Sequence, residues 1–449
     1  MNWERNGMRV LCCCALVCVA TGTVSESSSR GSLRTYLRES VLVKGPEWSI
    51  QGKRLLKDGS EFFIKGLNYQ PIPVGGADYG DDKVGYGNIG DYLSQPWSEI
   101  YKRDIPNLRS MGVNVVKNYF FWRCAPLDNT PIKESLEQCQ EYLKTNDGID
   151  HTEFLDTLWN SGQDPIFMII PVAVEVGNTL ANPDSASMQD YRDFYQWVAK
   201  DLMATYGSHP AVLGVMIGNE LNQKNLVSDP TKAADFWQAL TDIKNAAVEG
   251  FKMAGVSDPE HTRVISTALQ HDPAFTTYTD ALKNYEAIFN VLTVNPYEQC
   301  GVSEDTSVFG QYAKSTLPML LGEWGIPNSN SKTLLPDNAK AVADYITCYY
   351  NNHILKHQDI TLGSFYFEYS DEWWKLKGPT DLPWVQDLGS LSSDPKWNEE
   401  AFGLYSIKPD PSRPIADPWN KNLNAAYPPD ILTPLAGVEA FKNLVNPHP

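Results

Sequence analysis

Eight apolar runs, separated by segments of helical periodicity, constrain the fold of this chain more than any other feature of its sequence. The runs are continuously apolar rather than alternating, which is typical of strands buried on both faces of a parallel sheet. Between them, segments such as 98–112, 188–207 and 338–356 repeat apolar residues every three or four positions, as amphipathic helices do. The predicted strands are 62–69, 113–122, 165–172, 211–220, 263–270, 290–297, 318–325 and 362–371.

Eight strand–helix units predict an α/β fold, a (β/α)8 TIM barrel that forms one domain over residues 46–449. The segment that leads into the first strand, 48–69, predicts an N-terminal β-hairpin that turns at Asp58-Gly59. After the eighth strand, a Trp-rich insertion at about 373–400 is expected to form a loop. An open doubly wound sheet is the alternative, and it is disfavoured because no Gly-rich phosphate loop follows the first strand.

The N-terminus has the pattern of an export signal. Arg5 and Arg9 flank the start of a short apolar run that ends in small residues. We therefore expect residues 1–24 to be a signal peptide, residues 25–45 to be a polar linker, and the protein to be secreted to the extracellular space or the cell wall. A membrane anchor is the alternative, but the apolar run is short for a span and the C-terminus has no hydrophobic tail.

Four cysteines remain outside the expected signal peptide, and four cysteines allow three pairings. The pairing of Cys124 with Cys139 is favoured because both flank one loop, which leaves Cys300 with Cys348. Their scattered spacing does not resemble a zinc site.

The net charge of −18 argues against a nucleic-acid surface, which needs clustered Lys and Arg. The histidines show no metal spacing, and the chain has no serine elbow, phosphate loop or dinucleotide fingerprint. We therefore expect no metal and no cofactor, and we expect a monomer.

Two carboxylates stand at predicted strand ends that face each other across the mouth of an eight-stranded barrel. Glu220 ends the fourth strand and Glu323 ends the seventh. Retaining glycosidic cleavage needs such a pair, one acid and one nucleophile about 5–5.5 Å apart. We expect Glu220 to be the acid/base, Glu323 the nucleophile and Tyr297 its hydrogen-bond donor, with Asn219 binding the sugar 2-hydroxyl. The competing interpretation is that each Glu caps a helix or joins a structural ion pair.

Other residues at the strand ends are expected to bind substrate. Glu368 and its neighbour Glu372 are also alternative nucleophiles, or partners for Lys117 and Arg123. Trp373 forms either a stacking platform or a packing residue of the loop that follows. Besides Asn219, the expected substrate-binding residues are Tyr69, Tyr119, Trp324, Glu368 and Trp373.

Seven motifs, in this order, resemble the family 72 glycoside hydrolases, the β-1,3-glucanosyltransferases that remodel cell walls: "FFIKGLNYQP", "VNVVKNY", "GNELNQ", "NPYEQCG", "LLGEWG", "FEYSDE" and "EAFGLYSI". The resemblance covers about residues 48–410 and implies a retaining barrel with its two catalytic Glu at Glu220 and Glu323. It also implies the family's roles for Tyr297 and Cys300. The chain departs from the family at Lys117, where the family has Arg, and after Glu323, where it reads Trp-Gly-Ile-Pro.

The motifs and the carboxylate pair predict a secreted retaining enzyme that cleaves β-1,3-glucan and transfers the glycosyl unit to a sugar or to water. "GNE" followed by "GEWG" is shared with other barrel glycosidases, such as family 5 endoglucanases and mannanases. An endo-β-glycanase or mannanase acting on β-1,4-linked polysaccharide is therefore the alternative. A third hypothesis is a barrel that binds carbohydrate without catalysis.

Overall fold

The computed structural model describes residues 45–73, 91–124, 132–145, 148–174, 187–222, 230–271, 280–328, 339–372, 401–408, 410 and 429–448. These residues belong to one compact unit, Val43–Pro449. The expected signal peptide, the linker up to residue 44, and the Trp-rich insertion with Trp373 lie outside the described residues.

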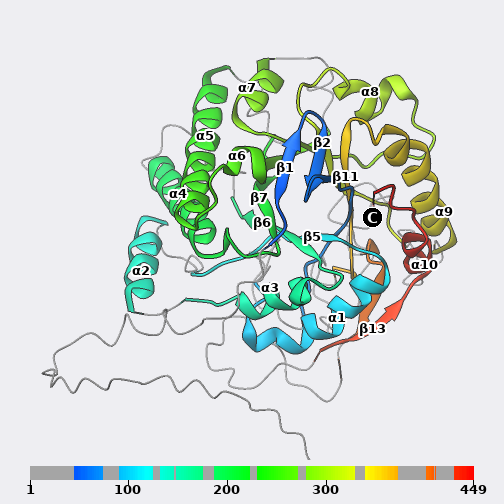
Figure 1. Cartoon of the computed structure of the whole chain (residues 1–449), viewed down its shortest axis with the longest axis horizontal. Helices are drawn as coiled ribbons and strands as arrows, with labels where there is room; N and C mark the ends of the chain where they lie inside the picture. The colour runs from blue at the N-terminus through cyan, green and yellow to red at the C-terminus, as the bar shows by residue number, and fades with distance from the viewer. Residues whose placement is uncertain are drawn as a thin grey trace, which may run out of the picture. The chain divides into compact units, whose positions relative to one another are not determined.

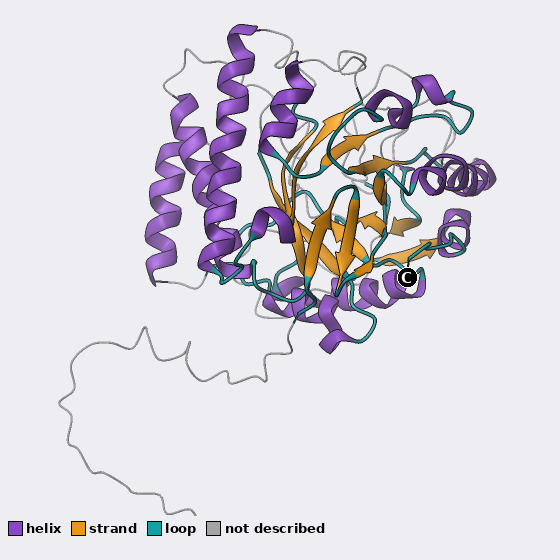
Figure 2. Ribbon diagram, turned by 45° about the horizontal axis from the view of Figure 1, so that its top comes forward, coloured by secondary structure: helices purple, strands orange, loops and turns teal. Residues whose placement is uncertain are grey.

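Eight parallel strands close into a barrel (Figures 1 and 2), so the predicted (β/α)8 fold is confirmed. Seven of these strands lie inside their predicted apolar runs, and the eighth begins one residue before its run, at Thr361. The barrel closes where the last strand pairs with the first, Gly363 opposite Ile64. The strands follow the chain around the barrel: β4 (Ile64–Asn68), β5 (Val115–Lys117), β6 (Phe167–Val172), β7 (Val212–Asn219), β8 (Val264–Gln270), β9 (Leu292–Asn295), β10 (Met319–Trp324) and β11 (Thr361–Tyr366).

Helices surround the barrel (Figure 2), and α4 and α5 run side by side along it (Figure 1). The periodic segments that predict helices coincide with α1, α4 and α9. The helices are α1 (Ser98–Ser110), α2 (Ile132–Thr145), α3 (Thr152–Trp159), α4 (Ser187–Tyr206), α5 (Pro230–Met253), α6 (Pro259–Thr262), α7 (Asp280–Ile288), α8 (Val308–Tyr312), α9 (Ala339–Tyr349) and α10 (Ala436–Lys442). Single 3-10 turns cover Gln95–Trp97, Asn160–Gly162, Glu304–Thr306 and Leu355–His357, and one π-helical turn covers Tyr350–Ile354.

An antiparallel sheet of three strands precedes the barrel: β1 (Trp48–Gln51), β2 (Arg54–Lys57) and β3 (Ser60–Glu61). The predicted turn at Asp58-Gly59 is confirmed, and both residues have positive φ, as a tight hairpin turn requires. A second turn, with Gly52 at φ 59°, adds the strand that the prediction of a simple hairpin missed. Trp48 of β1 packs edge-on against Phe167, with ring centroids 4.8 Å apart, and so covers the N-terminal end of the barrel.

Two apolar layers hold the barrel together. An inner cluster from alternate strand positions, among them Ile64, Val115 and Leu320, fills the barrel interior near the N-terminal ends of the strands. An outer cluster packs the other face of the strands against the helices. This alternation follows from the two-residue period of a strand, and it decides which strand-end side chains reach the mouth.

Both favoured disulfides are present. Cys124 bonds to Cys139 of α2, and Cys300 bonds to Cys348 of α9, with Cα–Cα distances of 5.7 and 6.0 Å. The second bridge ties the loop after β9 to the outer helix α9. A last antiparallel pair, β12 (Tyr405–Lys408) and β13 (Ile431–Pro434), precedes α10. In the part of the chain that the structure describes, no helix has the length and apolarity to cross a membrane, and no cluster of metal-ligating side chains occurs.

Candidate active site

Glu220 and Glu323 both lie at the C-terminal end of the barrel. Glu323 is the fifth residue of β10 and is 4% exposed, whereas Glu220 directly follows β7 and is half-buried. Tyr297 lies in the loop after β9. Burial first, and then the charges of Glu323 and Glu220, raise its pKa. The structure therefore brings together the three residues to which the sequence analysis assigned the chemistry.

The carboxylate of Glu323 is held at both oxygens. The Tyr119 hydroxyl donates to Oε1 at 2.6 Å, and the Tyr297 hydroxyl donates to Oε2 at 2.7 Å. The Lys117 ammonium lies 3.4 Å from the same Oε1 and 4.3 Å from the centre of the Tyr119 ring. Hydrogen bonds and an opposite charge of this kind stabilise the ionised form of a carboxylate and fix its orientation.

Burial determines the protonation of these donors. Burial first, and then the charge of Glu323, raise the pKa values of Tyr119 and Tyr297 well above their ordinary range. Both hydroxyls therefore keep their protons and act as donors. Burial lowers the pKa of Lys117, while the neighbouring carboxylates, with Glu323 the strongest, act in the opposite direction.

A sharp kink at the end of β7 presents Glu220. Gly218 and Glu220 have φ values of 68° and 51°, and the pairing of β7 with β8 shifts register between Met216 and Asn219. The positive φ of Gly218 favours glycine, and a Cβ there would also lie 2.7 Å from the end of the Leu221 side chain. A left-handed conformation at a non-glycine residue is uncommon and concentrates at functional sites.

Neighbouring strands hold this kink in place. The Glu220 N–H donates to the Ala268 carbonyl of β8 at 2.8 Å. The side-chain amide of Asn295, from β9, donates to Asn219 Oδ1 at 3.2 Å and to Glu220 Oε1 at 3.1 Å. Asn222, 1% exposed, exchanges two hydrogen bonds with the main chain of Gln270. The "GNELN" segment is thus fixed on both sides of the carboxylate.

Tyr119 and Lys117 both contact Glu323. Tyr119, expected to contact substrate, donates its hydroxyl to Glu323. Lys117, expected to pair with Glu368 or Glu372, pairs with Glu323. Asn68, the last residue of β4, is a polar strand-end residue to which no role was assigned from the sequence. It is fully buried, accepts from the Tyr119 hydroxyl at 3.2 Å and lies opposite Lys117 in the β4–β5 register.

Tyr69 and Trp324 are not brought to the carboxylates, which corrects the expectation that they bind substrate. Tyr69 is 1% exposed, and its hydroxyl donates to Asp104 of α1 at 3.0 Å. Trp324 is fully buried against Tyr349 of α9, with ring centroids 5.6 Å apart. The reason is strand alternation. Tyr69 follows inward-facing Asn68 and Trp324 follows inward-facing Glu323, so each packs on the helix side of the barrel.

Two further carboxylates lie near the site. Glu368, two residues after β11 and following a cis peptide bond, is 1% exposed and acts electrostatically on Lys117 and Tyr119. Glu372, 3% exposed, acts on Tyr297. Arg123, expected as a partner of these residues, bonds Asp201 of α4 at 2.7 Å. Both acidic residues belong to the surroundings of the carboxylate pair, where Glu368 is expected to bind substrate.

Comparison with known proteins identifies the fold. No family model and no curated protein sequence matches the chain. Solved structures do match. Gas2p of Saccharomyces cerevisiae, a family 72 β-1,3-glucanosyltransferase, is similar in a complex with a small compound, with a TM-score of 0.51 and 18% identity over 89% of this chain and 68% of that one. A Gas2p mutant in complex with laminaritetraose and laminaripentaose gives a TM-score of 0.50 and 17% identity over 89% and 67%.

More distant glycosidases share the fold at the same level. A family 2 β-galacturonidase from Eisenbergiella tayi, bound to galacturonate, gives a TM-score of 0.50 and 13% identity over 89% of this chain and 53% of that one. At these identities the likeness establishes the fold. The chain therefore shares the (β/α)8 barrel fold of these glycosidases, and the family 72 neighbour agrees with the resemblance that the sequence motifs show.

Proposed function

We propose that this protein is a secreted retaining β-glycan enzyme, with Glu323 as nucleophile and Glu220 as acid/base. The observation that carries the proposal is the arrangement around Glu323, whose two oxygens accept separate tyrosine hydroxyls beside a buried ammonium. Donors at both oxygens fix the direction of this carboxylate. Glu220, half-buried directly after β7 with an amide donor at Oε1, is the second carboxyl group that we propose for retention.

In the first step, Glu323 attacks the anomeric carbon and the glycosidic bond to the leaving oxygen breaks. Protonated Glu220 gives its proton to that oxygen, and the bond electrons leave with it, so a glycosyl ester on Glu323 and a shortened glycan result. Tyr119 and Tyr297 orient the attacking carboxylate. Asn219, whose amide oxygen accepts a hydrogen bond from Asn295, is the residue that we propose for the contact with the sugar 2-hydroxyl.

In the second step, Glu220 takes a proton from the acceptor, whose oxygen attacks the anomeric carbon and releases Glu323. Water as acceptor gives hydrolysis, and a sugar hydroxyl gives transfer. The family 72 resemblance of the motifs favours transfer.

β-1,3-Glucan is the substrate that we propose. The ordered motifs that resemble family 72 support it, and so does the neighbouring Gas2p structure with laminari-oligosaccharides. Two disulfides are consistent with an oxidising, extracellular location. The competing substrate is a β-1,4-linked glycan, because the shared barrel includes glycosidases of other specificities.

The test is incubation of the purified protein with reduced laminari-oligosaccharides, followed by mass spectrometry of the products. Products longer than the donor establish transfer, and products that are only shorter establish hydrolysis. Glu220→Gln and Glu323→Gln should each lower turnover by several orders of magnitude while leaving the fold intact. Wild-type turnover in either variant would overturn the assignment of the site. Turnover of β-1,4-glucan or mannan alone would show that this glycan, and not β-1,3-glucan, is the substrate.

A further inference from the structure

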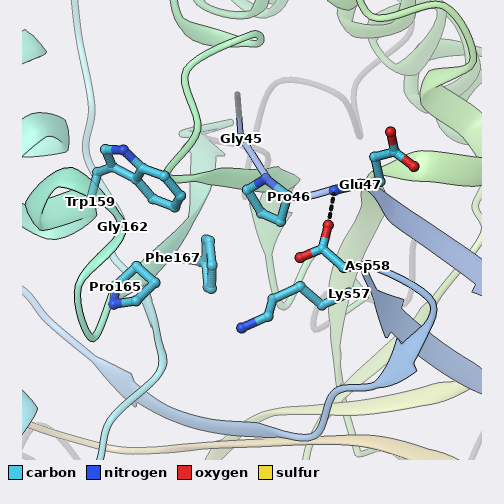
Figure 3. Close-up of a pocket in the computed structure, with 9 residues that line it drawn as sticks. All are labelled: Gly45, Pro46, Glu47, Lys57, Asp58, Trp159, Gly162, Pro165 and Phe167. Atoms are coloured by element: carbon cyan, nitrogen blue, oxygen red, sulfur yellow. Dashed lines mark hydrogen bonds between the residues drawn. The ribbon is translucent and has the colours of Figure 1, made fainter. Parts of the chain in front are cut away.

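A pocket of about 340 Å³ lies at the other end of the barrel from the two carboxylates (Figure 3). It is formed by residues before β1, by the end of β2 and by the connection from α3 to β6. Phe167 in its wall is the first residue of β6, whereas Glu220 follows the last residue of β7. Because the strands are parallel, the pocket and the proposed active site occupy opposite ends, and the pocket takes no part in the chemistry.

The pocket has a rigid apolar wall. Trp159, at the end of α3, is partly buried and tilts against Phe167 with ring centroids 6.3 Å apart. Pro46 and Pro165 line the same space, and Figure 3 shows these four rings around it. Gly162 has φ 82°, and a Cβ there would lie 3.3 Å from the Trp159 ring. The glycine therefore leaves this part of the indole uncovered.

Polar groups of both kinds complete the lining. The Lys57 ammonium lies 5.8 Å from the centre of the Phe167 ring. Within the described part of the chain it has ring contacts but neither an ion pair nor a hydrogen-bond acceptor. Asp58 and Glu47 bring two carboxylates, and Asp58 Oδ1 accepts the Glu47 N–H at 2.9 Å. A ligand here meets the Lys57 ammonium, the Asp58 carboxylate and the partly exposed ring of Trp159.

We propose that this pocket is a second, non-catalytic glycan site that binds one sugar ring of a β-glucan chain. A pyranose has an apolar C–H face that packs on an indole and a rim of hydroxyls that donate to carboxylates and accept from an ammonium. An anion is disfavoured because the lining has two acidic residues and one ammonium, and a purely apolar ligand would leave the Lys57 ammonium without an acceptor. Pockets for small ligands start at about 300 Å³, so this one admits a single ring.

The choice of glucan rests on the proposed function, and the site would anchor the enzyme to polymeric substrate. The first measurement is calorimetric titration of the Glu323→Gln protein with laminarihexaose. Two classes of binding site are expected. Trp159→Ala and Lys57→Gln, each added to Glu323→Gln, should remove one class or weaken it by at least about tenfold. The matched controls are Trp197→Ala, a partly buried Trp on α4, and Lys53→Gln on the same hairpin, and both should keep two classes.

A second readout uses the active enzyme. Trp159→Ala and Lys57→Gln should leave turnover of short laminari-oligosaccharides unchanged and lower the rate on insoluble β-1,3-glucan. A single class of binding site, or pocket variants that behave like their controls, would contradict the proposed glycan site in the pocket. The proposed function would be unaffected. Pocket-dependent binding without turnover by wild type would reject the proposed function and keep the pocket. Lys57→Gln changes one side chain at the end of β2, so the test survives if Trp159→Ala fails to fold.

Discussion

Glu323 is held by side chains that reach it from different parts of the barrel. Lys117 comes from β5, Tyr119 from the segment just after it, and Tyr297 from the loop after β9. Asn68 of β4 contacts Tyr119 and so extends the network. The proposed nucleophile needs a fixed direction, and donors at both oxygens supply it.

Replacing Tyr297 by Phe removes one donor while keeping the ring. A hydrogen bond to a charged group contributes about 1.5–3 kcal/mol, so kcat/KM should fall roughly 10- to 100-fold. The measurement is steady-state kinetics on laminari-oligosaccharides. Tyr350→Phe is the matched control, because that buried hydroxyl donates to the Val445 carbonyl on the outer side of the barrel. Equal kinetics for the two variants would contradict the role given to Tyr297.

Lys117→Met removes the charge beside Glu323. A hydrogen bond between charged groups contributes about 1.5–3 kcal/mol, so kcat/KM on laminari-oligosaccharides should fall roughly 10- to 100-fold. Lys117→Arg keeps the charge and should recover part of this loss. Wild-type kcat/KM in Lys117→Met would show that the two tyrosine donors alone orient Glu323.

At the residue scale, the sequence does not show which of two adjacent strand-end residues faces the barrel interior. Glu323 and Trp324 are adjacent at one strand end, as Asn68 and Tyr69 are at another, and both members of each pair were open to assignment. Only one member of each pair can face the barrel interior, because successive side chains alternate between faces. The aromatic member packs against helices in both cases, where a large apolar surface is buried.

At the scale of elements, the loop after β9 carries Tyr297, and a disulfide anchors it three residues later. Cys300 bonds Cys348 of α9, so the loop is tied to a helix that packs on the barrel. The other bridge, Cys124–Cys139, ties α2 to the segment after β5. The two bridges therefore allow a matched comparison.

Replacing Cys300 and Cys348 together by Ser should lower the free energy of unfolding by about 4 kcal/mol and also lower kcat/KM. The same change at Cys124 and Cys139 should cost about 3 kcal/mol with kcat/KM close to wild type. Denaturant unfolding and steady-state kinetics measure the two effects. If both double variants lost activity equally, the Cys300–Cys348 bridge would have no special part in holding Tyr297.

All eight barrel strands could be predicted, because strands buried on both faces are continuously apolar and need no partner to be recognised. The second turn of the leading sheet, at Gly52, was missed since Gly-Lys is a weaker turn signal than Asp58-Gly59. The kink at Gly218 and Glu220 could not be predicted either. It depends on a register shift between β7 and β8, which is a property of two strands and not of one.

For the whole molecule, Lys65 of β4 joins the barrel to the C-terminal segment. Its ammonium donates to the carbonyls of Lys442 and Leu444, at 3.1 and 3.0 Å. Burial lowers its pKa from 10.5 to about 8. Between these two values the unfolded chain holds more protons than the folded protein, so this group makes the free energy of unfolding rise with pH across that window.

Lys65→Met should therefore flatten the pH dependence of stability between about pH 8 and 10.5 relative to wild type. Denaturant unfolding at several pH values measures this slope. Lys200→Met, which alters a more exposed lysine paired with Glu249 on the outer helices, should keep the wild-type slope. An unchanged slope in Lys65→Met would mean that Lys65 keeps its proton throughout this range.

The sequence by itself determined the barrel and the order of its strands, and with these the placement of Glu220 and Glu323 at the same end of the barrel. Strand order follows from one-dimensional patterns of apolar residues, and in a closed parallel barrel all strands end at the same mouth. Tertiary structure alone decided which neighbour at each strand end faces inward, which donors hold Glu323, and that a pocket forms at the opposite end. Those features depend on register and on contacts between distant segments, such as Tyr297 with Glu323 and Trp159 with Phe167, and no single segment encodes them.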